Sequence, residues 1–214
     1  MNLENLLQDL LKRYPVLTDI RQPLFESFEI IKRTYEHGGK LLICGNGGSA
    51  ADADHIVGEL MKSFSMRRPI TSDVHGFLKE NYGKSGIYMS EKLEGALPAI
   101  SLSCHSALNT AFANDVDPDL IFAQQLIGYG IKGDVLLGIS TSGNSVNTVY
   151  AMMVAKAKGL SVVGLVGRDG GEFVKYCDVL INVGGTNTPE IQELHLPVYH
   201  TLCRMLEIHF FGNH

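Results

Sequence analysis

The chain has 214 residues, of which 45% are hydrophobic, and its formal net charge is −5 at pH 7. This length suits one domain with a sizeable core. The acidic balance excludes the broad positive surface of a protein that binds DNA or RNA directly. The N-terminus does not resemble a targeting leader, and no apolar run reaches membrane-spanning length. We therefore expect a cytoplasmic protein that binds neither nucleic acid nor membrane.

Helical and strand patterns alternate along the chain. Amphipathic spacing predicts two N-terminal helices, over residues 3–12 and 22–36. Apolar runs of strand length follow at 41–44, 99–102, 135–139, 161–166 and 179–183. Further helices are predicted over 49–62, 107–128, 144–158 and 189–210. This order predicts an α/β fold: a three-layer αβα arrangement with a five-stranded parallel sheet and additional N-terminal helices.

The cysteines do not have the spacing of a metal site or of a disulfide framework. They stand singly at Cys44, Cys104, Cys177 and Cys203. Thiolate metal sites and disulfide frameworks usually show paired spacings. We predict four buried thiols.

Two segments rich in glycine and serine are the most informative local patterns. Gly-Asn-Gly-Gly-Ser at 45–49 and Ser-Thr-Ser-Gly-Asn-Ser at 140–145 each follow a predicted strand and open a predicted helix. Such turns bind phosphate through free N–H groups and hydroxyls. Neither has the lysine of a P-loop or the spacing of a dinucleotide fingerprint, which favours a small phosphorylated ligand. Helix capping would explain one such segment, but two favour a ligand site.

Polar side chains on two predicted helices suggest chemistry near these loops. His55 and Glu59 are four residues apart, and therefore lie one turn apart on the same helix face. They can share a metal ion or a substrate hydroxyl, and a surface ion pair is the alternative. Gln192 and His200 are eight residues apart, about two turns, and can face one pocket. The alternative there is a helix histidine satisfied by its neighbours.

A family resemblance rests on four segments of the chain: 44–49, 134–145, 167–171 and 191–195. They resemble the sugar isomerase (SIS) domain family and, within it, the phosphoheptose isomerases. The resemblance implies one SIS domain over residues 1–214, with N-terminal helices in 1–39, assembled as a homotetramer with active sites between subunits. It also implies conversion of sedoheptulose 7-phosphate to D-glycero-D-manno-heptose 7-phosphate through an enediol, for heptose, lipopolysaccharide and other surface polysaccharide biosynthesis.

The resemblance also implies roles for individual residues. The implied substrate-binding residues are Asn46, Gly47, Gly48, Ser49, Asn114, Asp115, Ser140, Thr141, Ser142, Ser145 and Gln192. The implied zinc ligands are His55, Glu59, Gln192 and His200. Glu59 and His200 are in addition the implied catalytic acid–base pair. Nitrogen and oxygen donors suit zinc, although glutamine is a weak ligand and implies a loosely held ion. Aldose–ketose conversion needs a pair of groups that move protons.

The chain departs from the family pattern in two places. Residues 64–98 contain a polar insertion that typical phosphoheptose isomerases lack. It is expected to be either a solvated loop with one or two short helices, or a lid or subunit contact. Pro189 and Glu190 stand where the family commonly has an acidic residue followed by a basic one. This second departure bears on the substrate contacts.

Three alternative functions follow from the same resemblance. The first is an isomerase of another ketose phosphate. The second is a non-catalytic SIS protein that associates with the bacterial replication initiator, but such proteins generally lack the counterparts of Glu59 and His200, which this chain has. The third is a sugar-phosphate-sensing regulator. Regulators usually add a DNA-binding domain, whereas the residues before the first predicted strand lack the character of a recognition helix.

Overall fold

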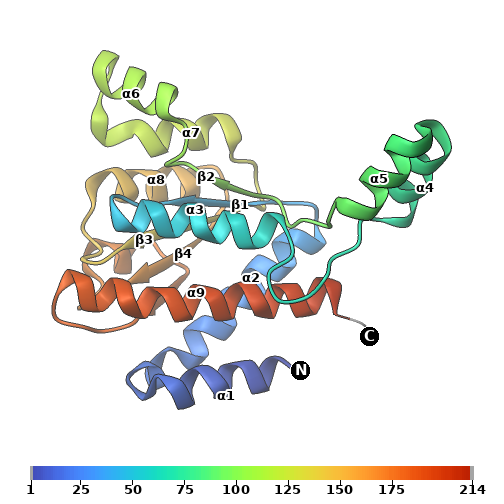
Figure 1. The fold of residues 1–214 in the computed structure, drawn as a ribbon. Coiled ribbons are helices and arrows are strands. Elements are labelled where there is room, and N and C mark those ends of the chain that lie inside the picture. Colours follow the sequence, from blue (N-terminus) through green and yellow to red (C-terminus); the bar gives the residue numbers. More distant parts are fainter. Residues whose placement is uncertain (1, 213–214) are drawn as a thin grey trace.

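The computed structural model describes residues 2–212, and a five-stranded parallel sheet forms its centre (Figure 1). The strands are β1 (Leu41–Cys44), β2 (Ala99–Ser101), β3 (Val135–Ser140), β4 (Ser161–Val166) and β5 (Val179–Asn182). Their order across the sheet is β2-β1-β3-β4-β5, and every pairing is parallel. The predicted parallel sheet is confirmed. Strands β1 and β3 are buried along their whole length, as expected for strands covered on both faces.

Helices cover both faces of this sheet, so the predicted three-layer α/β fold is also confirmed. The first layer consists of α1 (Leu3–Arg13), α2 (Arg21–Glu36), α3 (Gly48–Met61) and α9 (Thr188–Phe211). The opposite layer contains α6 (Ser106–Asp115), α7 (Ile121–Tyr129) and α8 (Val146–Ala157). Alternate residues of β1 point to the two layers: Ile43 packs in the first apolar cluster and Leu42 in the second.

Short 3₁₀ helices connect several of these elements, and they are η1 (Pro15–Ile20), η2 (Pro118–Leu120) and η3 (Gly171–Lys175). The N-terminal helix α1 is amphipathic, begins after Asn2, whose side chain accepts the Asn5 N–H at 2.8 Å, and packs on α9. Within residues 2–212, none of the helices combines the length and the apolar character that a membrane crossing requires.

The prediction of one helix over 107–128 is wrong. The chain leaves helical geometry at Val116, and Asp117 has an extended conformation with φ −165°. Pro118 follows, and proline disfavours the helical conformation in the residue before it. The Asp117 side chain then accepts the Asp119 N–H at 2.8 Å and starts η2. The segment therefore divides into α6, η2 and α7.

The cysteines also correct a prediction. Cys44 and Cys203 are buried, as expected, and Cys177 is half-buried. Cys104 is exposed and its thiol donates to Asp54 at 2.8 Å, so the prediction of a buried thiol is wrong there. The residue lies in the loop between β2 and α6.

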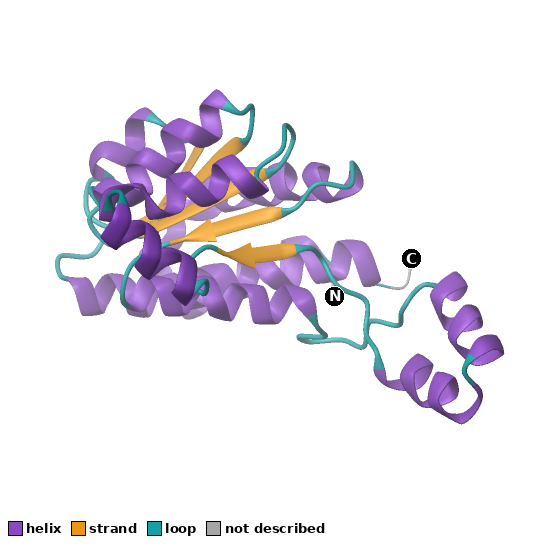
Figure 2. Cartoon of the chain, turned by 90° about the horizontal axis from the view of Figure 1, so that it is seen from above, coloured by secondary structure: helices purple, strands orange, loops and turns teal. Residues whose placement is uncertain are grey.

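The insertion within 64–98 forms a helical hairpin of α4 (Ser72–Asn81) and α5 (Gly83–Lys92), which projects from the rest of the chain (Figure 2). Gly86 allows the close approach of the two helices, since a Cβ atom there would lie 1.8 Å from the Leu78 carbonyl oxygen. Phe77 and Tyr88 are exposed on the hairpin. The expected short helices are thus present, whereas a lid or a subunit contact stays a prediction.

Candidate active site

The two glycine- and serine-rich loops meet at the point where the strand order reverses. The chain places β2 on one side of β1 and β3 on the other, so the carboxyl ends of β1 and β3 are neighbours. Cys44, the last residue of β1, pairs with Gly138 near the end of β3. In open parallel sheets, ligands bind beyond the strand ends at such a reversal. Loops 45–49 and 140–145 begin there.

The first loop presents an uncapped helix start. Gly47 precedes α3 with φ +56°, and no side chain caps the helix. Within the described chain, the Gly47 and Gly48 N–H groups donate no hydrogen bond. Such free N–H groups at a helix start attract anions. Gln192 packs against Gly48, since a Cβ atom there would lie 2.5 Å from the Gln192 Nε2 atom and would displace this side chain.

The second loop gathers hydroxyl groups around a tight turn. The Ser140 and Ser145 Oγ atoms lie 3.0 Å apart, and Ser142 Oγ accepts the Asn144 N–H at 3.2 Å. Gly143 has φ +66°, and a Cβ atom there would lie 2.0 Å from the Gly170 carbonyl oxygen. The turn is therefore packed against the loop that follows β4. The Thr141 carbonyl accepts the Gly167 N–H of that loop at 3.3 Å.

A pair of asparagines joins the two loops. Asn46 Nδ2 donates to Asn147 Oδ1 at 2.8 Å, and Asn147 Nδ2 donates to Asn46 Oδ1 at 3.0 Å. Asn147 lies in the first turn of α8, which follows the second loop. Sequence reasoning missed Asn147, because nothing in its local pattern distinguishes it from a surface residue of that helix. The paired amides place the two candidate phosphate loops side by side.

Farther along α3 from the first loop, α3 and α9 bring three side chains together. His55 Nε2 lies 3.1 Å from Glu59 Oε1 and 3.4 Å from His200 Nε2. Glu59 is also paired with Lys62 at 3.2 Å. The side chain of His55 is 41% exposed and that of Glu59 is 12% exposed. The cluster is therefore open to a ligand on the His55 side.

Tyr199 and Asp52 support the other side of the His55 ring. Tyr199 donates its hydroxyl proton to Asp52 Oδ1 at 3.2 Å, and the Tyr199 hydroxyl oxygen lies 3.0 Å from His55 Nδ1. Burial raises the pKa of Tyr199, and the Asp52 carboxylate raises it further, so the phenol keeps its proton. Burial likewise raises the pKa of Asp52. Sequence reasoning missed Asp52 altogether.

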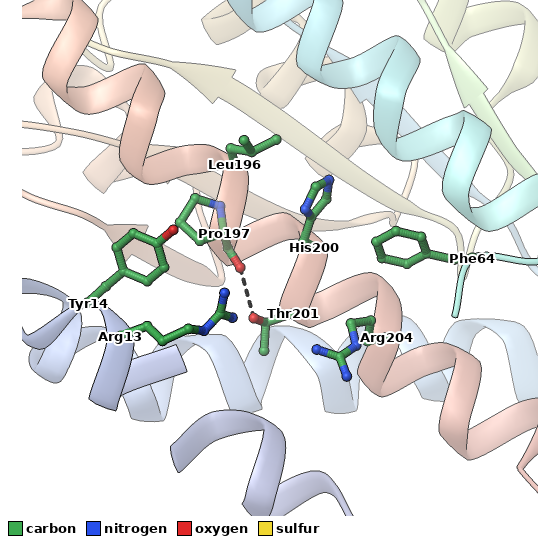
Figure 3. Close-up of a pocket in the computed structure, with 8 residues that line it drawn as sticks. All are labelled: Arg13, Tyr14, Phe64, Leu196, Pro197, His200, Thr201 and Arg204. Atoms are coloured by element: carbon green, nitrogen blue, oxygen red, sulfur yellow. Dashed lines mark hydrogen bonds between the residues drawn. The ribbon is translucent and has the colours of Figure 1, made fainter. Parts of the chain in front are cut away.

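His200 lines a pocket between α1 and α9. Figure 3 shows His200 and Phe64 on one side of this pocket, with Tyr14 and Arg13 across from them. The Phe64 and His200 rings are tilted with centroids 5.2 Å apart. Burial lowers the pKa of His200, and the neighbouring His55 lowers it further, which favours the neutral imidazole. A neutral imidazole can both accept and donate a proton.

The structure does not join every predicted site residue to this cluster. Gln192 lies over Gly48 at the first loop. Asn114 donates to Asp115 at 2.9 Å on α6, and within residues 2–212 no hydrogen bond links either side chain to the loops or to His55. Gln192 is thus a neighbour of the first loop, and the roles predicted for Asn114 and Asp115 stay predictions.

A buried arginine holds the helix end that carries Glu59. Arg68 Nε donates to Glu207 Oε1 at 2.7 Å, and both side chains are fully buried. The same guanidinium donates to the Leu60 carbonyl at 2.8 Å and to the Glu59 carbonyl at 2.9 Å. Arg68, which precedes the hairpin of the insertion, therefore ties α3 to α9. The sequence did not signal this, because Arg68 reads there as one of two adjacent surface arginines.

Comparisons with known proteins agree with this geometry. The SIS domain family model matches residues 8–100 and 95–167. Phosphoheptose isomerase of Trichlorobacter lovleyi is 37% identical over 91% of this chain and 86% of its own length. The solved phosphoheptose isomerase of Neisseria gonorrhoeae is 32% identical, with a TM-score of 0.71 over 96% of this chain and 92% of that one. The corresponding structure from Francisella tularensis is 28% identical, with a TM-score of 0.75 over 91% and 90%. The chain therefore belongs to the SIS domain family, among the phosphoheptose isomerases.

Proposed function

We propose that the protein is a cytoplasmic aldose–ketose isomerase that converts sedoheptulose 7-phosphate to D-glycero-D-manno-heptose 7-phosphate, for heptose and surface polysaccharide biosynthesis. One observation carries the proposal. Loop 45–49 opens α3, and the same helix carries His55 and Glu59, which meet His200 of α9. Curated relatives of similar length are named phosphoheptose isomerases.

The phosphate group is the part of the substrate that the loops would bind. Free N–H groups at Gly47 and Gly48 supply donors with the positive end of the α3 dipole. Hydroxyl groups of the second loop add neutral donors that suit a phosphate without a compensating cation. The proposed substrate contacts are Asn46, Gly47, Gly48, Ser49, Ser140, Thr141, Ser142, Ser145 and Gln192, with Asn114 and Asp115 contributed by α6.

The proposed isomerisation is a sequence of proton transfers. The Glu59 carboxylate removes a proton from C1 of the ketose, and the C1–C2 double bond of an enediol forms as the C2 carbonyl oxygen gains a proton. His200 moves protons between the oxygens on C2 and C1. Glu59 then returns a proton to C2, which leaves an aldehyde at C1 and a hydroxyl at C2. Groups that act in this way accelerate a reaction by about 10²- to 10⁴-fold each.

Zinc is the proposed cofactor, with His55, Glu59, Gln192 and His200 as its ligands. Imidazole and carboxylate donors suit this ion. The fit rests on His55 Nε2, which faces a carboxylate oxygen at 3.1 Å and another imidazole nitrogen at 3.4 Å, an arrangement that a cation would stabilise. Within residues 2–212, no three His, Cys, Asp or Glu side chains form a ready metal cage, so binding would require the side chains to adjust. Bound zinc would polarise the sugar oxygens.

We also propose a homotetramer of single SIS domains spanning residues 1–214, with active sites between subunits. Large apolar side chains are exposed on α7 and α8, including Ile127, Tyr150 and Met153. Exposed apolar patches of this kind commonly mark association surfaces. Shared sites would also give α6 a role, since Asn114 and Asp115 could then contact a substrate bound to a neighbouring subunit.

An isomerase of a different ketose phosphate is the second candidate. The observation that favours it is Glu190, whose carboxylate accepts from the Thr186 N–H at 2.9 Å and so is tied to its own loop beside Gln192. Substrate contacts near Gln192 then differ from those expected of a basic residue. The test is incubation with a panel of ketose phosphates, read by NMR for aldose formation. Exclusive turnover of another ketose would replace the substrate, and no turnover of any would favour a non-catalytic SIS protein.

A further inference from the structure

The hairpin of α4 and α5 leaves its apolar side chains uncovered. The two helices have ten residues each and pack on one another at Gly86, away from the sheet (Figure 2). α4 has no buried residue, and the buried residues of α5 are Gly86 and Ser90. Isolated helices of this length are marginally stable in water. The hairpin therefore gains stability if another surface covers it.

The uncovered side chains are numerous enough for a specific interface. Val74 and Phe77 are three residues apart on one face of α4, and the Phe77 and Tyr82 rings meet with centroids 6.1 Å apart. Six large apolar side chains of the hairpin and its ends are between 44% and 65% exposed: Val74, Phe77, Tyr82, Ile87, Tyr88 and Leu93. Each offers about 100 Å². Two copies of the hairpin would then bury up to about 1,200 Å² of apolar surface, which reaches the size of a specific interface.

The charges of the two helices complement each other. α4 has two acids and one lysine, whereas α5 has two lysines and one acid. These residues are Asp73, Lys79 and Glu80 on α4, and Lys84, Glu91 and Lys92 on α5. The hairpin as a whole is neutral, so it lacks the positive surface that nucleic acid or an acidic membrane attracts. In a second copy turned about a two-fold axis, α4 of one copy meets α5 of the other, and opposite charges face each other.

The base of the hairpin holds it in one orientation. Pro69 and Glu94 form an antiparallel bridge, and the Gly95 N–H donates to the Arg68 carbonyl at 2.7 Å. The Glu94 carboxylate also accepts the Ser63 N–H at 2.8 Å. A surface held in place before it binds loses less conformational entropy on association.

We propose that the hairpin of α4 and α5 pairs with the same hairpin of a second copy, with α4 of each on α5 of the other, as a four-helix bundle about a two-fold axis. Such an interface is isologous, because both copies use the same residues. It is separate from the surface of α7 and α8. The inference goes beyond the proposed function, and its tests measure mass and amide exchange, so they decide it whether or not the protein isomerises a sugar.

The first test is the solution mass of Phe77→Asp, measured by light scattering after size exclusion. A charge on the apolar row should halve the mass of the assembly, because the contacts of the hairpin are lost while any other interface stays. Phe77→Leu is the matched control, since it keeps an apolar side chain and should keep the wild-type mass. An unchanged mass in Phe77→Asp, an equal fall in both variants, or a monomeric wild type would overturn the proposal. In the first of these outcomes, a wild-type tetramer would still stand without the hairpin.

Hydrogen exchange of the full chain tests the pairing without relying on mass. Amides of α4 and α5 should exchange at least about tenfold more slowly in the wild type than in Phe77→Asp, because short helices without a partner open readily. Amides of β3 are the internal control and should be equally protected in both proteins. Equal exchange of the hairpin amides in both proteins would contradict a covered hairpin.

Charge reversal identifies the occupant. Lys84→Glu with Lys92→Glu makes both helices acidic, and Asp73→Lys with Glu80→Lys makes both basic. Each double variant alone should have half the wild-type mass, because like charges then face each other across the pair. An equimolar mixture of the two should regain the wild-type mass, since α4 and α5 of the partners again have opposite charges. A mixture that stays at half the mass would show that a second hairpin is not the occupant.

Discussion

At the scale of single residues, Glu59 is the side chain on which the proposed chemistry depends most. It is held at the end of α3, where its carboxylate contacts His55 and its backbone carbonyl accepts from Arg68. A group fixed from both sides can stay aligned with a substrate carbon without much loss of conformational entropy on binding.

Glu59→Gln should therefore nearly abolish turnover while leaving the fold intact, because it removes a proton acceptor with little change in shape. We expect kcat to fall by about 10²- to 10⁴-fold, measured with the ketose phosphate that turns over best. Glu193→Gln, on an exposed position of α9, is the control and should retain full activity. An active Glu59→Gln protein would remove Glu59 from the proton transfers.

Ser142 tests the phosphate loops at the same scale. Its hydroxyl is read as a phosphate donor that contacts ground state and transition state equally, so Ser142→Ala should raise KM and leave kcat almost unchanged. A hydrogen bond to a charged group is worth about 1.5–3 kcal/mol, which corresponds to a KM increase of about tenfold or more. A large fall in kcat at constant KM would contradict this role.

At the scale of elements, the ion pair of Arg68 and Glu207 connects the insertion, α3 and α9. Glu207 accepts from the Phe64 and Ser65 N–H groups at 2.8 Å, and Arg68 stacks over the Phe211 ring at 5.1 Å. Both buried charges therefore have hydrogen-bond partners, and these polar contacts anchor the projecting hairpin at its base.

Arg68→Met should destabilise the protein by about 3–5 kcal/mol, since it leaves Glu207 buried without its cation. The measurement is equilibrium unfolding in urea. Arg67→Met is the matched control, because the neighbouring arginine is exposed and its loss should change the free energy of unfolding by less than about 0.5 kcal/mol. Similar losses in both variants would show that the buried pair has no special role.

The ion pair of Arg68 and Glu207 also predicts a pH dependence of the free energy of unfolding. Burial alone would raise the pKa of Glu207, but hydrogen bonds from Ser65, Phe64 and Arg68 outweigh it and hold the pKa below its usual 4.5. A carboxyl whose pKa is lower in the folded state stabilises that state above its unfolded pKa, and the contribution is lost as the pH falls through the folded pKa. Unfolding free energies measured below pH 4.5 should therefore decline more steeply in the wild type than in Glu207→Gln. Parallel declines would contradict this.

At the scale of the whole molecule, both layers of helices leave large apolar side chains exposed. The layer of α1, α2, α3 and α9 packs around one large apolar cluster but leaves Phe25, Met61 and Leu196 exposed. On the other face, α7 and α8 leave Ile127, Tyr150 and Met153 exposed. The hairpin of α4 and α5 projects away from the sheet (Figure 2), and it carries further exposed aromatic side chains. A single chain thus keeps apolar surface that assembly would bury.

The proposed tetramer predicts a solution mass of four times the 23.4 kDa of one chain, measured by light scattering after size exclusion. Ile127→Asp should lower that mass if the surface of α7 and α8 is an interface, because it would bury an unpaired charge. Asp119→Asn, a neutral change at an exposed position, is the control. A monomer in the wild type would leave the active site within one chain and contradict shared sites.

The sequence by itself determined the sheet, its parallel direction and the position of the two glycine- and serine-rich loops, because apolar runs and glycine-rich turns are local signals. It also placed His55 and Glu59 on one helix face, since helical spacing is regular. Only the tertiary structure decided the contacts between distant segments: Asn46 with Asn147, Tyr199 with Asp52, and Arg68 with Glu207. Each joins residues more than one hundred positions apart, and such pairs depend on how helices pack rather than on any local pattern.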